Sequence, residues 1–311
     1  MDDLTIMHKK IGLALGSGSA RGLAHFGVIR ALQEEGFEIG WVSGSSIGAV
    51  VGAAFAAGAH EQLEQSYRDM DRKKIWSLLD IMIPRSGIIE GEKVVRFVVE
   101  HIGVEKIEAL TLPMSIVTTN LNTGKAEIFT SGSIAEAIRA SIAVPGFMAP
   151  IKIGNELYVD GGIVIPTPVE PVRQLGADFV VAVDLNSHLA TNGKRIGRRR
   201  ETNRYEWLDK LQKRVTSIDH PMLAGLKHWI EGEPAPGLWE VLMSSVDIMQ
   251  ARISELSLTQ SPPDILIQPA LSHIRFLDFH KADEVIEIGY TTAKRAIADF
   301  RKHHDKQAPP L

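Results

Sequence analysis

Two glycine-rich turns, each placed between a short apolar run and a helical pattern, constrain the fold of this chain more than any other feature. Residues 11–15 form an apolar run of strand length, and a glycine-serine turn separates them from a helical pattern at about 20–35. Residues 38–43 begin a second such unit, whose Ala/Gly-rich helix extends to about residue 57. Successive strand-turn-helix units are typical of a mostly parallel sheet covered by helices on both faces.

The alternation of strands and helices continues along the chain. We therefore predict an α/β fold of three layers, α/β/α, with a mostly parallel central sheet. The chain has 311 residues, of which 44% are apolar, so one large domain over 1–311 can bury a sizeable core. The further predicted elements are helices at 60–79, 91–102, 133–142 and 281–300, and strands at 113–119, 125–130, 179–185 and 264–268.

The composition excludes several classes of protein. Cysteine is absent, which excludes disulfides, thiolate metal sites and a cysteine nucleophile. The formal net charge is −4, so the chain has no overall basic field and no nucleic-acid partner is predicted. No histidine or carboxylate cluster has metal-ligand spacing, so we predict neither a metal nor another cofactor.

Two apolar stretches bear on localisation. Glycine and serine at 16–19 interrupt the first one, which therefore does not resemble a signal peptide. Residues 39–59 carry no charge, but their continuous apolar part, 49–57, would cross only about half of a ~30 Å bilayer core. A buried strand and a buried helix explain that stretch better. We predict a cytoplasmic location, with peripheral contact at the inner face of the membrane as a separate hypothesis.

Residues 187–260 differ in composition and predict a basic, helical, cap-like insertion. Residues 194–214 carry nine Lys or Arg against three acids, and the helical stretch that follows adds Trp229 and Trp239. Such residues favour an anionic membrane surface, so 194–256 is a candidate for peripheral contact. The alternative is a solvated loop followed by a helix that packs on the core. The apolar positions of that helix are Leu238, Leu242, Met249, Ile253 and Leu256.

The motif Gly44-x-Ser46-x-Gly48 lies between the second apolar strand and its small-residue helix. Glycines permit a sharp strand-to-helix turn that lifts the serine hydroxyl out of the sheet, and the helix N-terminus supplies free N–H groups. The pattern alone is weak evidence, but its strand-turn-helix setting is the one that a nucleophile elbow needs. We predict that Ser46 is the nucleophile of a serine hydrolase, against the alternative of a plain tight turn.

The first glycine-rich turn, Gly16 to Gly22, can provide backbone N–H groups to an anion. A dinucleotide fingerprint fails here by one residue, because Arg21 occupies the place of the third glycine. An oxyanion hole needs only two N–H groups aimed at one point. Arg21 is a candidate anion contact, with a solvated or capping arginine as the alternative. The candidate oxyanion donors are the N–H groups of Gly18, Ser19 and Ala20.

A third motif, Asp160-Gly161-Gly162, follows an apolar strand and is by itself a common turn signal. A serine nucleophile needs a base, and an aspartate at a strand end can reach it. An ordinary carboxylate is a weak base at neutral pH, so Asp160 must be partly desolvated or Ser46 made easier to deprotonate. No histidine is clearly placed as the base, although His273 and His280 follow the last strand, where a Ser-Asp-His triad would have one.

Taken in order, these motifs resemble those of the patatin-like phospholipase family, and more closely those of its bacterial cytoplasmic members. The resemblance covers residues 10–185 strongly and 239–290 more loosely. It is carried by the loop ending in Arg21-Gly22 and followed by His25, the elbow around Ser46, the segment 140–146, and Asp160-Gly161-Gly162 with Pro166 downstream.

The resemblance implies a single patatin-like domain in which Ser46 is the nucleophile, Asp160 its partner and the loop around Gly18 the oxyanion hole. The implied substrates are acyl esters of phospholipids, lysophospholipids or related lipids. Where plant members have three glycines, this chain has Ser17-Gly18-Ser19. Because serine tolerates positive φ poorly, it stays open which N–H groups face the oxyanion. Two other functions also stay open: a non-catalytic nucleotide- or phosphate-binding module, and a Ser-Asp-His esterase of small soluble esters.

Overall fold

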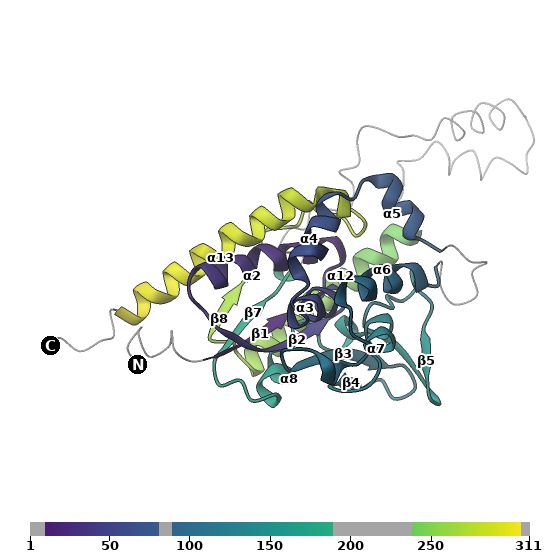
Figure 1. Ribbon diagram of the computed structural model, residues 1–311, viewed down its shortest axis with the longest axis horizontal. Helices are drawn as coiled ribbons and strands as arrows, with labels where there is room; N and C mark the ends of the chain where they lie inside the picture. The colour runs from purple at the N-terminus through teal and green to yellow at the C-terminus, as the bar shows by residue number, and fades with distance from the viewer. Residues whose placement is uncertain (1–9, 81–88, 189–237, 306–311) are drawn as a thin grey trace, which may run out of the picture. The chain divides into compact units, whose positions relative to one another are not determined.

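The computed structural model describes residues 10–80, 89–188 and 238–305 (Figure 1). The chain divides into two compact units, Met1–Thr191 with Val246–Leu311, and Asn192–Ser245. The basic stretch 194–214, Trp229 and the side chain of Trp239 lie outside the described residues, and so does most of the predicted insertion 187–260.

A central sheet of the predicted α/β type organises the first unit. Among the described residues its strand order is β5-β6-β3-β2-β1-β7-β8, and β4 also pairs with β3. The pairings among β3, β2, β1, β7 and β8 are parallel, and β4, β5 and β6 add an antiparallel edge. The strands are β1 (Ile11–Leu15), β2 (Ile39–Ser45), β3 (Met114–Asn120), β4 (Ala126–Phe129), β5 (Ile151–Ile153), β6 (Glu156–Asp160), β7 (Val180–Val183) and β8 (Ile265–Ile267).

Helices cover both faces of this sheet, as the buried parallel strands require. Figure 1 shows α2, α3, α4 and α13 on one face and α8 on the other. The helices are η1 (Ser19–Leu23), α2 (Ala24–Glu34), α3 (Ile47–Ala56), α4 (His60–Arg68), α5 (Arg72–Leu78), α6 (Glu92–Ile102), α7 (Ile134–Ser141), α8 (Val169–Gln174), α12 (Leu238–Gln260) and α13 (Ala282–Asp305).

The long helix α13 runs along α2 (Figure 1), and two glycines allow the two helices to approach closely. A Cβ atom on Gly27 of α2 would lie 2.0 Å from the carbonyl oxygen of Ile286, and one on Gly289 of α13 would lie 2.2 Å from that of Ala24. Any side chain at either position would push the helices apart. This contact joins the C-terminal helix to the helix that follows the first glycine-rich turn.

One sequence-based expectation changes in detail. The stretch 60–79 is not one helix but two, because Asp71 begins a new helix by accepting a hydrogen bond from the N–H of Lys74. The uncharged stretch 39–59 forms β2 and α3, as expected for a buried strand followed by a buried helix. Within the described ranges, no helix has both the length and the apolar character needed to span a bilayer.

Candidate active site

Ser46 lies at the sharp turn between β2 and α3, and its backbone has the unusual angles φ 56° and ψ −124°. A non-glycine residue with positive φ is uncommon and persists only where its surroundings hold it. Here the N–H of Ser46 donates to the Oγ of Ser141 at 2.9 Å, and that hydroxyl donates to the carbonyl of Val117 at 2.7 Å. The buried Ser141 therefore holds the elbow from the end of α7.

Both glycines of the elbow are required by close backbone contacts. A Cβ on Gly44 would lie 2.4 Å from the carbonyl oxygen of Gly48, across the turn. A Cβ on Gly48 would lie 2.1 Å from the carbonyl oxygen of Leu15, at the end of β1. The Gly-x-Ser-x-Gly pattern thus serves the packing of α3 against the neighbouring strand as well as the turn itself.

Asp160 ends β6 and faces Ser46. The Ser46 hydroxyl donates to Oδ2 of Asp160 at 2.5 Å, and the other carboxylate oxygen accepts the N–H of Gly162 at 2.7 Å. The Asp160 side chain is 1% exposed and Ser46 is 5% exposed. The backbone of Asp160 is fixed as well, since its carbonyl accepts the Thr119 hydroxyl at 2.8 Å. The structure brings these two predicted residues into direct contact.

The environment of Asp160 changes its acidity. Burial raises the pKa of Asp160 from 3.8 to about 7, while the hydrogen bonds from Ser46 and Gly162 oppose that rise. A carboxylate with a pKa near 7 is a much better general base at neutral pH than an exposed one. The Asp160 carboxylate is therefore desolvated, as a general base at neutral pH would need to be.

The two glycines after Asp160 are also constrained. A Cβ on Gly161 would lie 2.2 Å from the carbonyl oxygen of Val117, and one on Gly162 would lie 2.7 Å from atoms of Ser17 and Gln250. The Asp-Gly-Gly turn thus packs directly against β3 and against the first glycine-rich loop. This close packing explains why small residues follow Asp160.

Two N–H groups of the glycine-rich loop have no acceptor among the described residues: those of Gly18 and Ser19. The N–H of Ala20 donates to the carbonyl of Phe276 at 3.3 Å, so the expectation that Ala20 is an oxyanion donor is wrong. Gly16 and Ser17 likewise use their N–H groups within the protein, on the carbonyls of Val183 and Pro166. Most backbone N–H groups of this loop are therefore already hydrogen-bonded within the protein and cannot together bind a phosphate group.

Ser19 occupies one of the positions at which the plant motif has glycine. It adopts a positive φ of 49°, which serine tolerates poorly, and its hydroxyl donates to the carbonyl of Phe276 at 2.6 Å. This hydrogen bond holds the strained residue in place. A serine can thus occupy a position where the related plant motif has glycine.

Arg21 does not lie free to contact an anion. Its side chain is 3% exposed, and its guanidinium group binds the carboxylate of Asp247 with nitrogen–oxygen distances of 2.7 and 3.3 Å. Gly22, the next residue, packs against Ile47, whose side-chain atoms would lie 2.1 Å from a Cβ at that position. The sequence-based role of Arg21 as an anion contact is therefore replaced by a buried ion pair.

Sequence reasoning missed two further groups at the site. Ser141 was visible only as part of a recognisable segment, and nothing in the sequence indicated that it holds the elbow. Ile47 follows Ser46 at the start of α3, and its N–H has no acceptor among the described residues. In nucleophile elbows the N–H after the serine contributes to the oxyanion hole, which is the general rule that could have identified Ile47.

The two histidines considered for a triad have other partners. His273 pairs with Glu284 at 2.9 Å, and Nε2 of His280 lies 3.3 Å from Arg72. His25 is fully buried and binds the carbonyl of Gly16 at 2.8 Å. Burial lowers the pKa of His25 to about 4, against the opposing effect of that hydrogen bond, so at neutral pH a neutral Nε2–H donates to the glycine-rich loop.

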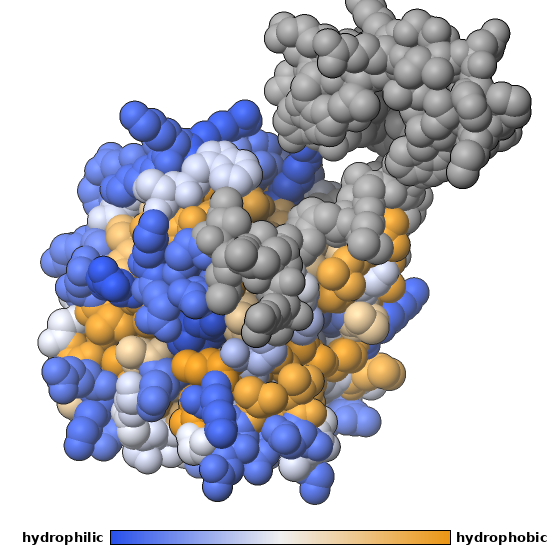
Figure 2. All heavy atoms as spheres, turned by 90° about the vertical axis from the view of Figure 1, so that its right-hand side faces the viewer, coloured by the Kyte–Doolittle hydropathy of each residue, from blue (hydrophilic) through white to orange (hydrophobic). Residues whose placement is uncertain are grey.

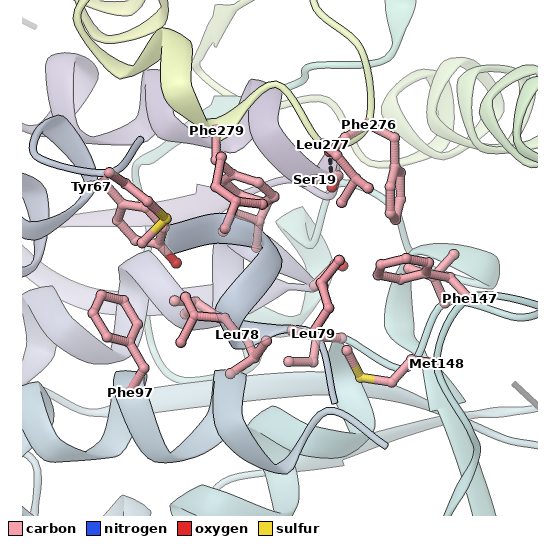
Figure 3. A pocket seen from close by; sticks show the side chains of 18 residues that line it. Ser19, Tyr67, Leu78, Leu79, Phe97, Phe147, Met148, Phe276, Leu277 and Phe279 are labelled. Atoms are coloured by element: carbon pink, nitrogen blue, oxygen red, sulfur yellow. Dashed lines mark hydrogen bonds between the residues drawn. The ribbon is translucent and has the colours of Figure 1, made fainter. Parts of the chain in front are cut away.

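An apolar pocket opens onto Ser46 and Ser19 (Figure 3). Figure 3 shows Tyr67, Phe97 and Phe279 gathered on one side and Phe147 beside Phe276 on the other. Tyr67 stacks on Phe279 with ring centroids 5.9 Å apart and meets Phe97 edge-on. No group of three or more metal-ligating side chains occurs in the part of the chain that the structure describes.

Comparison with known proteins identifies the family. A family model described as patatin-like phospholipase matches residues 13–173, which include the loop, the elbow and Asp160. The chain belongs to the patatin-like phospholipase family. Members of this family are lipid hydrolases, so the fold and motifs described above are those of a lipid hydrolase.

The relatives extend this result over nearly the whole chain. Proteins of the NTE family from Mycobacterium tuberculosis and Mycobacterium bovis are 34% identical, over 96% of this chain and 94% of theirs. Lysophospholipase NTE1 of Pyricularia oryzae is 28% identical over 97% of this chain but only 19% of its own length. Human patatin-like phospholipase domain-containing protein 6 is 28% identical over 94% of this chain and 20% of its own length. The chain thus corresponds to about a fifth of these two larger proteins.

Proposed function

We propose that this protein is a serine lipid acyl hydrolase that cleaves carboxylic esters through a Ser46–Asp160 dyad. The observation that carries the proposal is the 2.5 Å hydrogen bond between Ser46 Oγ and the buried Asp160 carboxylate, at the mouth of an apolar pocket. No described histidine is hydrogen-bonded to either residue. A dyad is therefore favoured over the Ser-Asp-His esterase.

The proposed reaction has two stages. In the first, Ser46 Oγ attacks the ester carbonyl, Asp160 takes the hydroxyl proton, and the N–H groups of Gly18, Ser19 and Ile47 stabilise the oxyanion. Collapse of the tetrahedral intermediate expels the alcohol, which takes the proton from Asp160, and leaves an acyl group on Ser46. In the second, Asp160 takes a proton from water, the resulting attack forms the fatty acid, and the proton returns to Ser46 Oγ.

The pocket indicates the class of substrate. Its walls are almost wholly apolar and rich in aromatic side chains, and such a surface binds a hydrocarbon chain by burying its CH₂ groups at about 0.8 kcal/mol each. It offers few polar partners for a head group. An acyl chain of a phospholipid or lysophospholipid is the best fit, in keeping with the names of the lysophospholipase and phospholipase relatives.

A labelling experiment combined with a substrate series tests this function. We expect a fluorophosphonate probe to modify Ser46, and p-nitrophenyl esters to be cleaved with a KM that falls as the acyl chain lengthens from acetyl to decanoyl. Lysophospholipids and diacyl phospholipids presented in the same assay would identify the head group and position. Absence of labelling, together with thermal stabilisation by a nucleotide or by inorganic phosphate, would favour the non-catalytic binding module instead.

We further propose that residues 194–256 contact an anionic membrane surface. The nine basic residues of 194–214 supply charge, at about 1 kcal/mol for each group near such a surface. In the described part of α12, Ile248, Met249 and Leu256 expose 48%, 55% and 66% of their surface. Figure 2 views the molecule from the side that carries α5 and α6, and apolar surface lies there among hydrophilic side chains. Trp76 of α5 is 63% exposed.

Vesicle co-sedimentation tests membrane contact. Binding is expected to vesicles of anionic phosphatidylglycerol and to weaken at high salt, because salt screens exposed charges. Replacing Trp76 with Ala should also weaken binding to these vesicles. The control is Leu121→Ser, at an exposed apolar position between β3 and β4, which should not change binding. Binding that is absent at low salt, or unaffected when Arg198, Arg199 and Arg200 become Glu, would exclude this contact.

A further inference from the structure

The buried side of α12 carries polar side chains beside the buried Met243 and Ala251. Asp247, Gln250 and Ser254 are spaced by three and four residues, so they share one side of the helix. From that side each binds another part of the first unit: Asp247 pairs with Arg21, Gln250 accepts the Ser17 hydroxyl at 3.2 Å, and Ser254 donates to Asp184 at 3.1 Å. The apolar face, with Met249 and Leu256, is exposed. Of the apolar positions that the sequence singles out in this helix, Leu242, Met249 and Leu256 are exposed.

The contact between Asp247 and Arg21 leads directly to the oxyanion loop. Arg21 donates from its two terminal nitrogens to the Asp247 carboxylate. Its third donor, Nε, binds the carbonyl oxygen of Gly18 at 3.1 Å, and the N–H of Arg21 binds the same oxygen at 3.2 Å. The Gly18 carbonyl therefore accepts two hydrogen bonds from one residue, and the orientation of that residue's side chain is set by α12.

Fixing this carbonyl also fixes an N–H group. The peptide bond between Gly18 and Ser19 is planar and trans, so its C=O and its N–H point in opposite directions. When Arg21 holds the oxygen of Gly18, the N–H of Ser19 must point away from Arg21. That N–H has no acceptor among the described residues, and Ser19 lines the pocket together with Ser46.

We propose that Asp247 is a positioning residue for catalysis: through the Arg21 guanidinium it locks the Gly18–Ser19 peptide so that the Ser19 N–H faces the oxyanion. This inference rests on the proposed hydrolase function and adds a second role to α12, which would otherwise only pack on the domain. Asp247 touches neither substrate nor nucleophile. It acts because a guanidinium held on both terminal nitrogens by a carboxylate cannot rotate its Nε away from Gly18.

The expected effect is on turnover rather than on binding. Removing an oxyanion-hole donor lowers kcat by about 10²- to 10³-fold in serine hydrolases. A donor that is only loosened should be less costly, so Asp247→Asn is expected to lower kcat for a soluble p-nitrophenyl ester by about 10- to 100-fold. KM should change less than about threefold, because the apolar pocket that binds the acyl chain is untouched.

A cycle of variants separates positioning from a general loss of stability. In an Arg21→Met background, Asp247→Asn should have almost no further effect on kcat, since Asp247 acts only through Arg21. The matched control is Ser254→Ala on the same side of α12, because the hydroxyl of Ser254 binds Asp184 and Thr167 directly and no residue of the glycine-rich loop. This control should lower thermal stability with kcat within about twofold of the original protein.

The outcomes distinguish the two proposals. An original protein that neither labels with fluorophosphonate nor cleaves esters would overturn the proposed function itself. If the original protein is active but Asp247→Asn behaves like Ser254→Ala, or its effect persists in full in the Arg21→Met background, Asp247 has only a structural role. A loss of kcat confined to Asp247→Asn and absorbed by Arg21→Met supports the positioning role.

Discussion

Ser46→Ala and Asp160→Asn are each expected to lower ester hydrolysis by about 10³- to 10⁵-fold, because residues of a nucleophile–base unit lose most of their effect when either is removed. Ser46→Ala deletes the attacking oxygen. Asp160→Asn keeps the shape of the side chain and its contact with the Gly162 N–H, but removes the group that accepts the proton. Single-turnover kinetics with a p-nitrophenyl ester would measure the loss of the acylation step directly.

Histidine variants provide the control for this expectation. His273→Ala and His280→Ala should retain activity within a few-fold, because His273 pairs with Glu284 and His280 with Arg72. Circular dichroism and thermal melting of every variant would establish that the fold is kept. A well-folded histidine variant without activity would restore the Ser-Asp-His triad, and full activity in Asp160→Asn would remove Asp160 from the mechanism.

Local sequence patterns indicate Ser46 and Asp160 as candidate site residues, but not that they are in contact. Ser46 follows β2, which is parallel to β3, but Asp160 ends β6, which is antiparallel to β3. The rule that the carboxyl ends of parallel strands meet at one edge therefore does not account for their contact. The elbow glycines could be predicted because a sharp turn needs small residues. The contact of Gly48 with the carbonyl of Leu15 at the end of β1 could not be predicted, because the two residues are 33 positions apart in the sequence.

The parts that the sequence does not predict depend on distant polar partners. Arg21 and Asp247 are separated by 226 residues, and neither carries a local signal of pairing. The alternative in which the apolar face of α12 packs on the core assumes that buried faces are apolar. That assumption fails here, since buried Arg21, Ser17 and Asp184 need polar partners, which α12 supplies.

The raised pKa of Asp160 follows from the same three-dimensional context. Asp160 has ordinary neighbours in the sequence, and its pKa is raised by burial beneath the elbow and the loop, not by any adjacent residue. Burying a carboxylate opposes its ionisation, which stabilises the protonated form and so makes the group a stronger base once ionised. Burial therefore makes the Asp160 carboxylate a stronger base but lowers the stability of the folded protein above neutral pH. Both the reaction rate and the stability should depend on pH.

The acylation rate is expected to rise with pH to a plateau, with a midpoint near the pKa of about 7 for Asp160. Only the ionised carboxylate can accept the proton of Ser46, so below pH 7 the rate should fall about tenfold per pH unit, to about a thousandth of the plateau near pH 4. The pH profile of kcat/KM with a soluble ester would measure this. His25, whose pKa is lowered to about 4, is neutral throughout most of this range.

Stability should change with pH in the opposite direction. Because the pKa of Asp160 is higher in the folded protein than in the unfolded chain, its contribution to stability is complete below about pH 4 and is lost as pH rises through 7. Asp160→Asn carries no charge there, so its melting temperature should exceed that of the original protein at pH 8, by a margin that shrinks at pH 5. An activity midpoint near pH 4, with no such gap in melting temperature at pH 8, would show that Asp160 is solvated and not the base described here.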